Sequence, residues 1–185
     1  MASKKRKEPP TDAEKDSSPE DFKQNLKRMK KSSSFNPLNF LRKTIIGDGN
    51  CLFRAILFCL TGDDSNYKSF RQEVCNYIIK QKDMYSSYFV NGEKGLLSEM
   101  EEMKKNGTWG TGLELYAASE MLLFNFEVFY ANNMTTYCSC LHFPELPTIY
   151  LEFENGNHFN SLFPEEGKSK FFNRGEKQNK QFLKQ

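Results

Sequence analysis

The sequence has no long apolar run. A membrane-spanning helix needs about eighteen consecutive apolar residues, and no stretch of this sequence reaches that length. The first residues are charged and polar, where a secretory signal peptide would carry an apolar segment. We therefore expect a protein of the cytoplasm, the nucleus or both, without a membrane partner.

Cysteine and histidine are both scarce. The five cysteines show no regular spacing and are odd in number, so reduced thiols are expected in such a compartment. Of the two histidines, His142 follows Cys138 and Cys140 at alternate positions. Zinc takes four ligands at wider spacing, and no second pair lies nearby. We therefore predict core thiols and a surface histidine there, with no metal and no cofactor.

Charge divides the chain into three parts. Residues 1–34 hold ten Lys/Arg against six Asp/Glu, residues 165–185 hold six against three, and residues 35–164 hold ten against fifteen, a net of −5. The length suits one domain with tails. We expect a disordered basic tail over 1–34, a single domain over 35–164 and a loose, polar, basic tail over 165–185.

Two basic clusters lie in the first tail, at 4–7 and 27–31, about twenty residues apart. They have the form of a bipartite nuclear import signal, and a solvated charged tail would have the same composition. A nuclear protein whose basic arm binds nucleic acid is a third interpretation. The acidic domain disfavours nucleic acid, because phosphate contacts need Lys/Arg on the folded surface or on an engaged arm. A basic protein partner suits it better.

Apolar spacing predicts four helices. The run 51–60 is apolar on nearly every side, which favours a helix at the centre of the core, with Gly62 at its end. A stripe of Phe70, Val74 and Ile78 predicts an amphipathic helix over 66–82. A third helix is expected over 93–105, and a fourth over 111–123, where Thr111 and Glu114 fit a capping box.

The second half of the domain changes to a strand period. Strands are expected over 126–130, 136–141, 148–153 and 158–163, and Asn155-Gly156 predicts a tight hairpin between the last two. A short β-branched segment over 44–46 leads into the loop before Cys51.

Cys51 stands where a glycine-containing loop meets the apolar helix. At a helix N-terminus the unpaired backbone N–H groups and the helix dipole favour thiolate over thiol, which can lower the cysteine pKa. The same N–H groups, with those of the preceding loop, can hold the oxyanion of a tetrahedral intermediate. One segment could therefore supply a nucleophile and charge stabilisation.

His158 is placed to serve as the base that such a nucleophile needs. It stands at the head of a strand, just past the hairpin turn, and Asn160 points to the same side two residues later. An asparagine amide could then orient the imidazole, as in a Cys-His-Asn set. From these residues alone, a polar hairpin-end histidine beside a turn-capping asparagine remains the alternative.

Three blocks, at 48–55, 109–117 and 157–162, resemble the signature blocks of the ovarian-tumour (OTU) cysteine peptidases in order, spacing and setting. The resemblance covers about residues 37–164. It implies an α/β (α+β) papain-like fold, in which a small mixed, mainly antiparallel sheet packs between helices and the helix beginning at Cys51 is central. It also implies a deubiquitinating peptidase that hydrolyses isopeptide bonds at the C-terminus of ubiquitin, with ubiquitin or polyubiquitin chains as partners. We expect a monomer.

The resemblance implies a role for each site residue. Cys51 would be the nucleophile, His158 the general base and then acid, and Asn160 the residue that orients His158. Asp48 resembles the family's loop aspartate, whose backbone would form the oxyanion hole with the Cys51 N–H. An N-terminal cap of the Cys51 helix is a compatible role for Asp48.

We also expect the substrate to contact the protein near Cys51. Because ubiquitin ends in two glycines, we expect a narrow slot near Cys51 lined by Gly49 and Asn50. Trp109 is expected to pack at the start of the fourth helix. The chain between the second and third helices is short, which predicts a small ubiquitin-contacting surface. The competing interpretation is an OTU-like module that is catalytically weak or inactive and binds ubiquitin or another protein without turnover.

Overall fold

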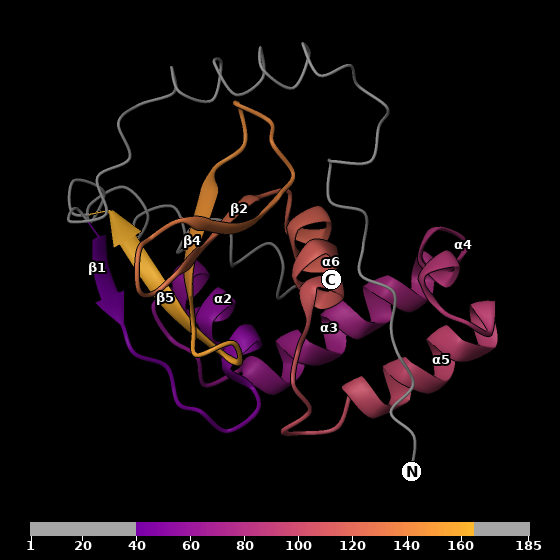
Figure 1. Cartoon of the computed structure of the whole chain (residues 1–185). Coiled ribbons are helices and arrows are strands. Elements are labelled where there is room, and N and C mark those ends of the chain that lie inside the picture. The colour runs from indigo at the N-terminus through magenta and orange to yellow at the C-terminus, as the bar shows by residue number, and fades with distance from the viewer. Residues whose placement is uncertain (1–39, 165–185) are drawn as a thin grey trace.

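The structure of the protein is a computed structural model, and the residues it describes are 40–164. The expected tails at 1–34 and 165–185, and the first residues of the expected domain at 35–39, lie outside the described residues. Figure 1 shows the strands on one side of the molecule and the longer helices on the other. Within 40–164, no helix is long and apolar enough to cross a membrane.

The described residues form five α-helices and one short 3-10 helix. The helix predicted over 66–82 is interrupted at Gln81, which caps one helix and precedes the next. The helices are α2 (Cys51–Thr61), α3 (Tyr67–Lys80), α4 (Lys82–Tyr85), η3 (Ser86–Tyr88), α5 (Gly92–Met103) and α6 (Gly112–Leu122).

Local sequence signals set the ends of two helices as expected. Gly62 ends α2 in the left-handed conformation, with φ 78°, and its N–H donates to the Phe58 carbonyl. At α6, the Thr111 hydroxyl accepts from the Leu113 N–H, and the Glu114 carboxylate accepts from the Thr111 N–H at 2.7 Å. Glu114 is buried, so the capping interpretation of this carboxylate is confirmed.

Five strands form one mixed sheet in the order β1-β5-β4-β2-β3, in which only β2 and β4 run parallel. The mixed, mainly antiparallel character predicted from the sequence is confirmed. The β-branched segment at 44–46 is not a strand; the first strand lies just before it and pairs with β5. The strands are β1 (Phe40–Lys43), β2 (Asn125–Tyr130), β3 (Thr136–Cys140), β4 (Thr148–Glu154) and β5 (His158–Pro164).

The hairpin between β4 and β5 sets the register of the site. Asn155 and Gly156 have φ 54° and 74°, as a tight turn with two left-handed central residues requires. In the resulting register His158 lies opposite Glu154 and Asn160 opposite Glu152. Residues two apart on one strand share a face, so these four side chains belong to the same face of the sheet.

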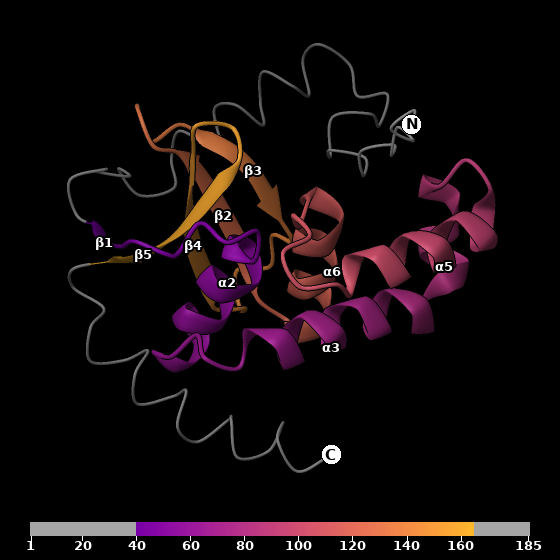
Figure 2. The same ribbon diagram turned by 90° about the horizontal axis from the view of Figure 1, so that it is seen from below.

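The main core lies between the helices and one face of the sheet (Figure 2). On this face, the Ser161 hydroxyl donates to the Ala55 carbonyl of α2 at 2.9 Å. Phe129 and Leu162, which alternate onto the opposite face, are buried outside this core. The α+β fold expected from the sequence, with the helix that begins at Cys51 packed on the sheet, is confirmed. The strand side chains of the main core are Phe126, Val128, Cys140, Ile149, Leu151 and Phe159.

Candidate active site

The loop before α2 is held by the Asp48 side chain. One carboxylate oxygen accepts from the Asn50 N–H at 3.0 Å, and the other accepts from Arg54 Nη2 at 2.8 Å. Burial alone would raise the pKa of Asp48, but the hydrogen bonds from Arg54 and Asn50 outweigh it and lower this pKa. Arg54 is itself fixed by Asp64 and lies over the Tyr67 ring, 3.6 Å from its centroid. The carboxylate therefore closes the loop. The capping role expected of Asp48 is wrong, because Asn50 is the N-cap residue of α2 and no side chain caps that helix.

Asn50 ties this loop to the rest of the protein. Its side chain is fully buried, and its Oδ1 accepts from Arg71 Nη2 at 2.7 Å and from the Gly107 N–H at 3.0 Å. Its Nδ2 donates to the Asp48 carbonyl. The prediction that Asn50 lines a substrate slot is therefore wrong for its side chain. The side chain points into the protein, where it forms hydrogen bonds with the Asp48 carbonyl, Arg71 and the Gly107 N–H.

Gly49 also faces inward. It has φ 78°, and a Cβ at this position would come within 2.1 Å of the Gly107 carbonyl oxygen. The peptide carbonyl of Gly49 accepts from Arg71 at 3.1 Å. The side of Gly49 where a side chain would stand is closed by the loop between α5 and α6, so Gly49 contributes close packing there and not a slot wall.

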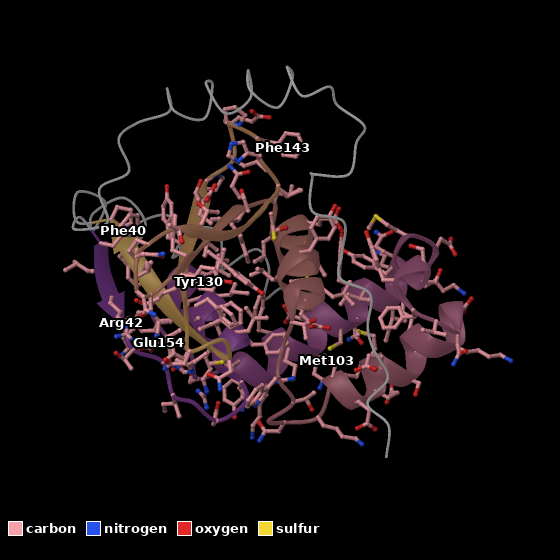
Figure 3. The ribbon with its side chains drawn as sticks, viewed as in Figure 1. Phe40, Arg42, Met103, Tyr130, Phe143 and Glu154 are labelled. Carbon is pink, nitrogen blue, oxygen red and sulfur yellow. The ribbon has the colours of Figure 1, made fainter. Side chains whose placement is uncertain are left out.

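Arg71 is a buried cation that sequence analysis did not identify. It lies one residue after Phe70 of the apolar stripe, donates to the Met103 carbonyl at 2.7 Å and stacks over the Phe53 ring at 4.2 Å. Figure 3 labels Met103 among the helices, away from the strands. An arginine adjacent to a helical apolar stripe is a weak signal, because on a helix of unknown orientation it also fits the solvent boundary.

Cys51 is the first residue of α2 and is 8% exposed. Burial raises the pKa of its thiol above the ordinary value of 9.0, and the Asp48 charge adds to this rise. Backbone hydrogen bonds from Phe159, Leu52 and Cys51 itself act in the opposite direction without outweighing burial. The expectation that the helix terminus alone favours the thiolate is therefore wrong, and the thiol needs a base.

The imidazole of His158 presents its two nitrogens to different neighbours. Nε2 lies 3.2 Å from Asn160 Oδ1, whereas the edge that carries Nδ1 faces Gly47, where an added Cβ would lie 3.7 Å from Nδ1. Asn160 is fully buried, and its Oδ1 also accepts from the Ile45 N–H. The structure thus brings His158 and Asn160 together and turns Nδ1 toward the loop that leads to Cys51.

Three further charged residues surround Asn160. Its Nδ2 donates to Glu152 Oε2 at 3.0 Å and to Glu154 Oε2 at 3.2 Å, and both carboxylates pair with Arg42. Figure 3 labels Arg42 and Glu154 close together at the β1 side of the sheet. The alternating Glu152 and Glu154 in an otherwise apolar strand were a visible signal, but nothing in the sequence pairs them with Arg42.

Trp109 and His142 both lie on the surface of the protein. Trp109 is 60% exposed, so the packing expected of it is wrong; the neighbouring Gly110 packs instead, because a Cβ there would lie 2.6 Å from the Leu52 side chain. His142 is exposed as expected, with Nδ1 3.8 Å from Glu127. Between residues 40 and 164, no three His, Cys, Asp or Glu side chains group as metal ligands.

Comparison with known proteins also points to a cysteine protease. A family model described as OTU-like cysteine protease matches residues 46–164. The ovarian tumor domain-containing deubiquitinating enzyme 7 of Arabidopsis thaliana is 30% identical over 120 residues, which cover 64% of this chain and 31% of that protein. The chain therefore spans about a third of that relative's length.

Solved structures share the arrangement of helices and strands. The OTU domain of OTUD1 superposes with a TM-score of 0.59 at 25% identity, covering 78% of this chain and 93% of that one. An ovarian tumor (OTU) domain in complex with ubiquitin superposes with a TM-score of 0.58 at 18% identity, covering 72% and 78%. The second likeness bears on the fold alone.

Proposed function

Because the chain belongs to the family of OTU-like cysteine proteases, we propose that it is a deubiquitinase that hydrolyses isopeptide bonds at the C-terminal glycine of ubiquitin. The observation that carries the proposal is the orientation of His158: Asn160 occupies its Nε2, and Nδ1 faces the loop before Cys51. A relative that is 30% identical is named as a deubiquitinating enzyme, and an OTU domain of similar fold has been solved in complex with ubiquitin.

The first step is attack by sulfur. Because burial raises the pKa of Cys51, the thiol transfers its proton to His158 Nδ1 as Sγ attacks the glycine carbonyl carbon. The carbonyl oxygen becomes an oxyanion, which the Cys51 N–H and the backbone of the Asp48 loop hold. The Asn50 N–H is not among these donors, because it already donates to the Asp48 carboxylate.

The second step releases the lysine. The tetrahedral intermediate collapses, its C–N bond breaks, and the proton on His158 moves to the departing amine, leaving ubiquitin bound to Cys51 as a thioester. Water then attacks the thioester carbonyl with His158 as base, and its proton returns to the Cys51 sulfur. The products are free ubiquitin, an unmodified lysine and the regenerated thiol.

The acidic domain suits this substrate. Residues 35–164 carry a net charge of −5 by their Lys, Arg, Asp and Glu content, which favours encounter with a basic protein surface. Such a field acts on the rate of association, so it does not select one linkage type or one ubiquitin-like modifier.

Ubiquitin release from a C-terminal fluorogenic conjugate tests the proposal. The wild-type protein should release the fluorophore, and Cys51→Ala should not. Cys59→Ala is the matched control, because Cys59 lies on the same helix and packs against the Tyr150 carbonyl; it should retain activity. Equal rates for wild type and Cys51→Ala would overturn the proposal.

A further inference from the structure

A chain of four polar side chains crosses three strands beside the active site. Arg42 on β1 reaches Glu152 and Glu154 on β4, at 2.6 and 2.5 Å, and both carboxylates accept from Asn160 on β5. The Glu152 side chain is 8% exposed and Asn160 is fully buried. The sheet order places β5 between β1 and β4, so Arg42 spans the strand that carries Asn160.

This chain determines which way the Asn160 amide faces. A carboxylate accepts hydrogen bonds and donates none, so the amide group toward Glu152 and Glu154 must be the NH₂. The carbonyl oxygen then faces the Ile45 N–H and His158 Nε2. If the amide turned over, its oxygen would meet two carboxylates and its NH₂ would meet the Ile45 N–H, so three of its four contacts would become unfavourable.

The amide orientation in turn determines the tautomer of His158. An oxygen beside Nε2 can only accept, so Nε2 carries the hydrogen and Nδ1 keeps its lone pair. A histidine whose Nδ1 is unprotonated can take a proton from a group on that side, and this side faces the loop before Cys51. The opposite tautomer would present an N–H there and could not act as the base.

We propose that Glu152, supported by Glu154 and Arg42, is a positioning residue that makes His158 a base at Nδ1 and requires asparagine at position 160. An aspartate at 160 would place a third carboxylate against Glu152 and Glu154, with no hydrogen to share between them. Arg42 is the described cation that pairs with both glutamates. The effect on turnover rests on the proposed function; the effect on thiol reactivity does not.

Glu152→Gln and Glu152→Ala test the role of Glu152, measured as kcat and KM for the ubiquitin conjugate. Both should lower kcat, with KM little changed. For Glu152→Ala we expect a loss of roughly ten- to a hundredfold, the range seen when a metal-binding histidine loses its outer-shell partner. Glu127→Gln is the matched control, since Glu127 bonds Ser139 and not Asn160; it should behave as wild type. Thermal unfolding shows whether each variant is folded.

Rescue distinguishes positioning from simple packing. Asn160→Asp should lose activity, and Asn160→Asp combined with Glu152→Gln should regain a large part of it, because the glutamine NH₂ can donate to the new carboxylate. A structural role predicts that the two losses add. Additive losses in folded proteins would overturn the proposal.

Alkylation of Cys51 gives a readout that needs no ubiquitin. The rate of iodoacetamide addition to Cys51, followed by peptide mass spectrometry from pH 5 to 10, should show a neutral-pH shoulder in wild type that shifts to alkaline pH in Glu152→Ala. If the profiles coincide, the inference is wrong even when wild type cleaves ubiquitin. If they differ and wild type releases no ubiquitin, the inference stands and the proposed function fails.

Discussion

At the scale of single residues, Asn50 joins three segments that are distant in sequence. Its amide contacts the Asp48 carbonyl, the guanidinium of Arg71 on α3 and the N–H of Gly107 in the loop between α5 and α6. Burying a charged guanidinium is costly unless its donors are paired, and Arg71 Nε already has no partner among the described residues. Asn50 therefore stabilises the fold and the site together.

Asn50→Ala should lower the free energy of unfolding by about 2–4 kcal/mol, because it removes one of the acceptors of the buried Arg71 and the acceptor of the part-buried Gly107 N–H. Chemical denaturation monitored by circular dichroism measures this. Asn66→Ala is the control: Asn66 is exposed and makes no side-chain capping bond to α3, so its change should be small. Equal effects of the two substitutions would contradict the role given to Asn50.

The two thiols of α2 should differ in reactivity. Burial raises the pKa of Cys59 to about 12, and its sulfur contacts the Tyr150 carbonyl rather than a histidine. In a Cys51→Ala protein, Cys59 should resist iodoacetamide at pH 9 and react fully once unfolded, as mass spectrometry would show. Because its pKa is raised on folding, Cys59 stabilises the fold below its ordinary pKa of 9.0, and this contribution is lost as pH rises toward 12. Rapid labelling of the folded protein at pH 9 would contradict this.

At the scale of elements, the start of α2 is positioned by contact between two loops. Gly49 lies against Gly107, and the Arg71 side chain bonds the Gly49 carbonyl and the Met103 carbonyl at the end of α5. The loop that carries exposed Trp109 is thus attached to the loop that precedes Cys51. A shift of one would move the other, and with it the backbone groups proposed to hold the oxyanion.

Gly49→Ala should therefore cost both stability and turnover. A left-handed φ alone costs a non-glycine residue roughly 1 kcal/mol, and here the new Cβ would also meet the Gly107 carbonyl at 2.1 Å. Gly92→Ala separates these causes, because Gly92 has φ 53° and open space around it. Its unfolding free energy should change by the conformational cost only, with kcat unaltered; if Gly49→Ala behaves the same way, the loop contact is not important.

The elements themselves were largely predictable, because their signals are local. The four-residue spacing of Phe70, Val74 and Ile78, the capping box at Thr111 and the Asn155-Gly156 turn each act within a few residues, and each is found where expected. The nucleophile, base and orienting residue were predicted by motif, and their roles stay predictions until activity is measured. The contact between His158 Nε2 and Asn160 Oδ1, at 3.2 Å, fits the orienting role predicted for Asn160.

The features that could not be predicted from the sequence depend on contacts between distant segments of the chain. Arg42 and Glu154 are 112 residues apart and Arg71 and Gly49 are 22 apart, and no periodicity links such pairs. The inward side chain of Asn50 and the outward Trp109 follow from the packing of the Gly107 loop, which exists only in three dimensions. The raised pKa of Cys51 likewise follows from its burial in the folded domain, which the sequence does not show.

At the scale of the whole molecule, the sheet joins the two halves of the site. The main core fixes α2, and so Cys51, on one face through contacts such as Ser161 to Ala55. The opposite face carries His158, Asn160 and the polar chain from Arg42. The catalytic assembly therefore depends on the domain being folded as one unit, since neither helix nor strand holds both groups.

The most direct test of the account is labelling with ubiquitin that carries an electrophile at its C-terminus, followed by peptide mapping of the adduct. The account predicts one adduct, on Cys51. It should form with the folded protein and not with protein that was unfolded beforehand, and the rate of its formation should fall strongly in His158→Ala. The absence of an adduct with a folded wild-type protein, or an adduct on another cysteine, would contradict it.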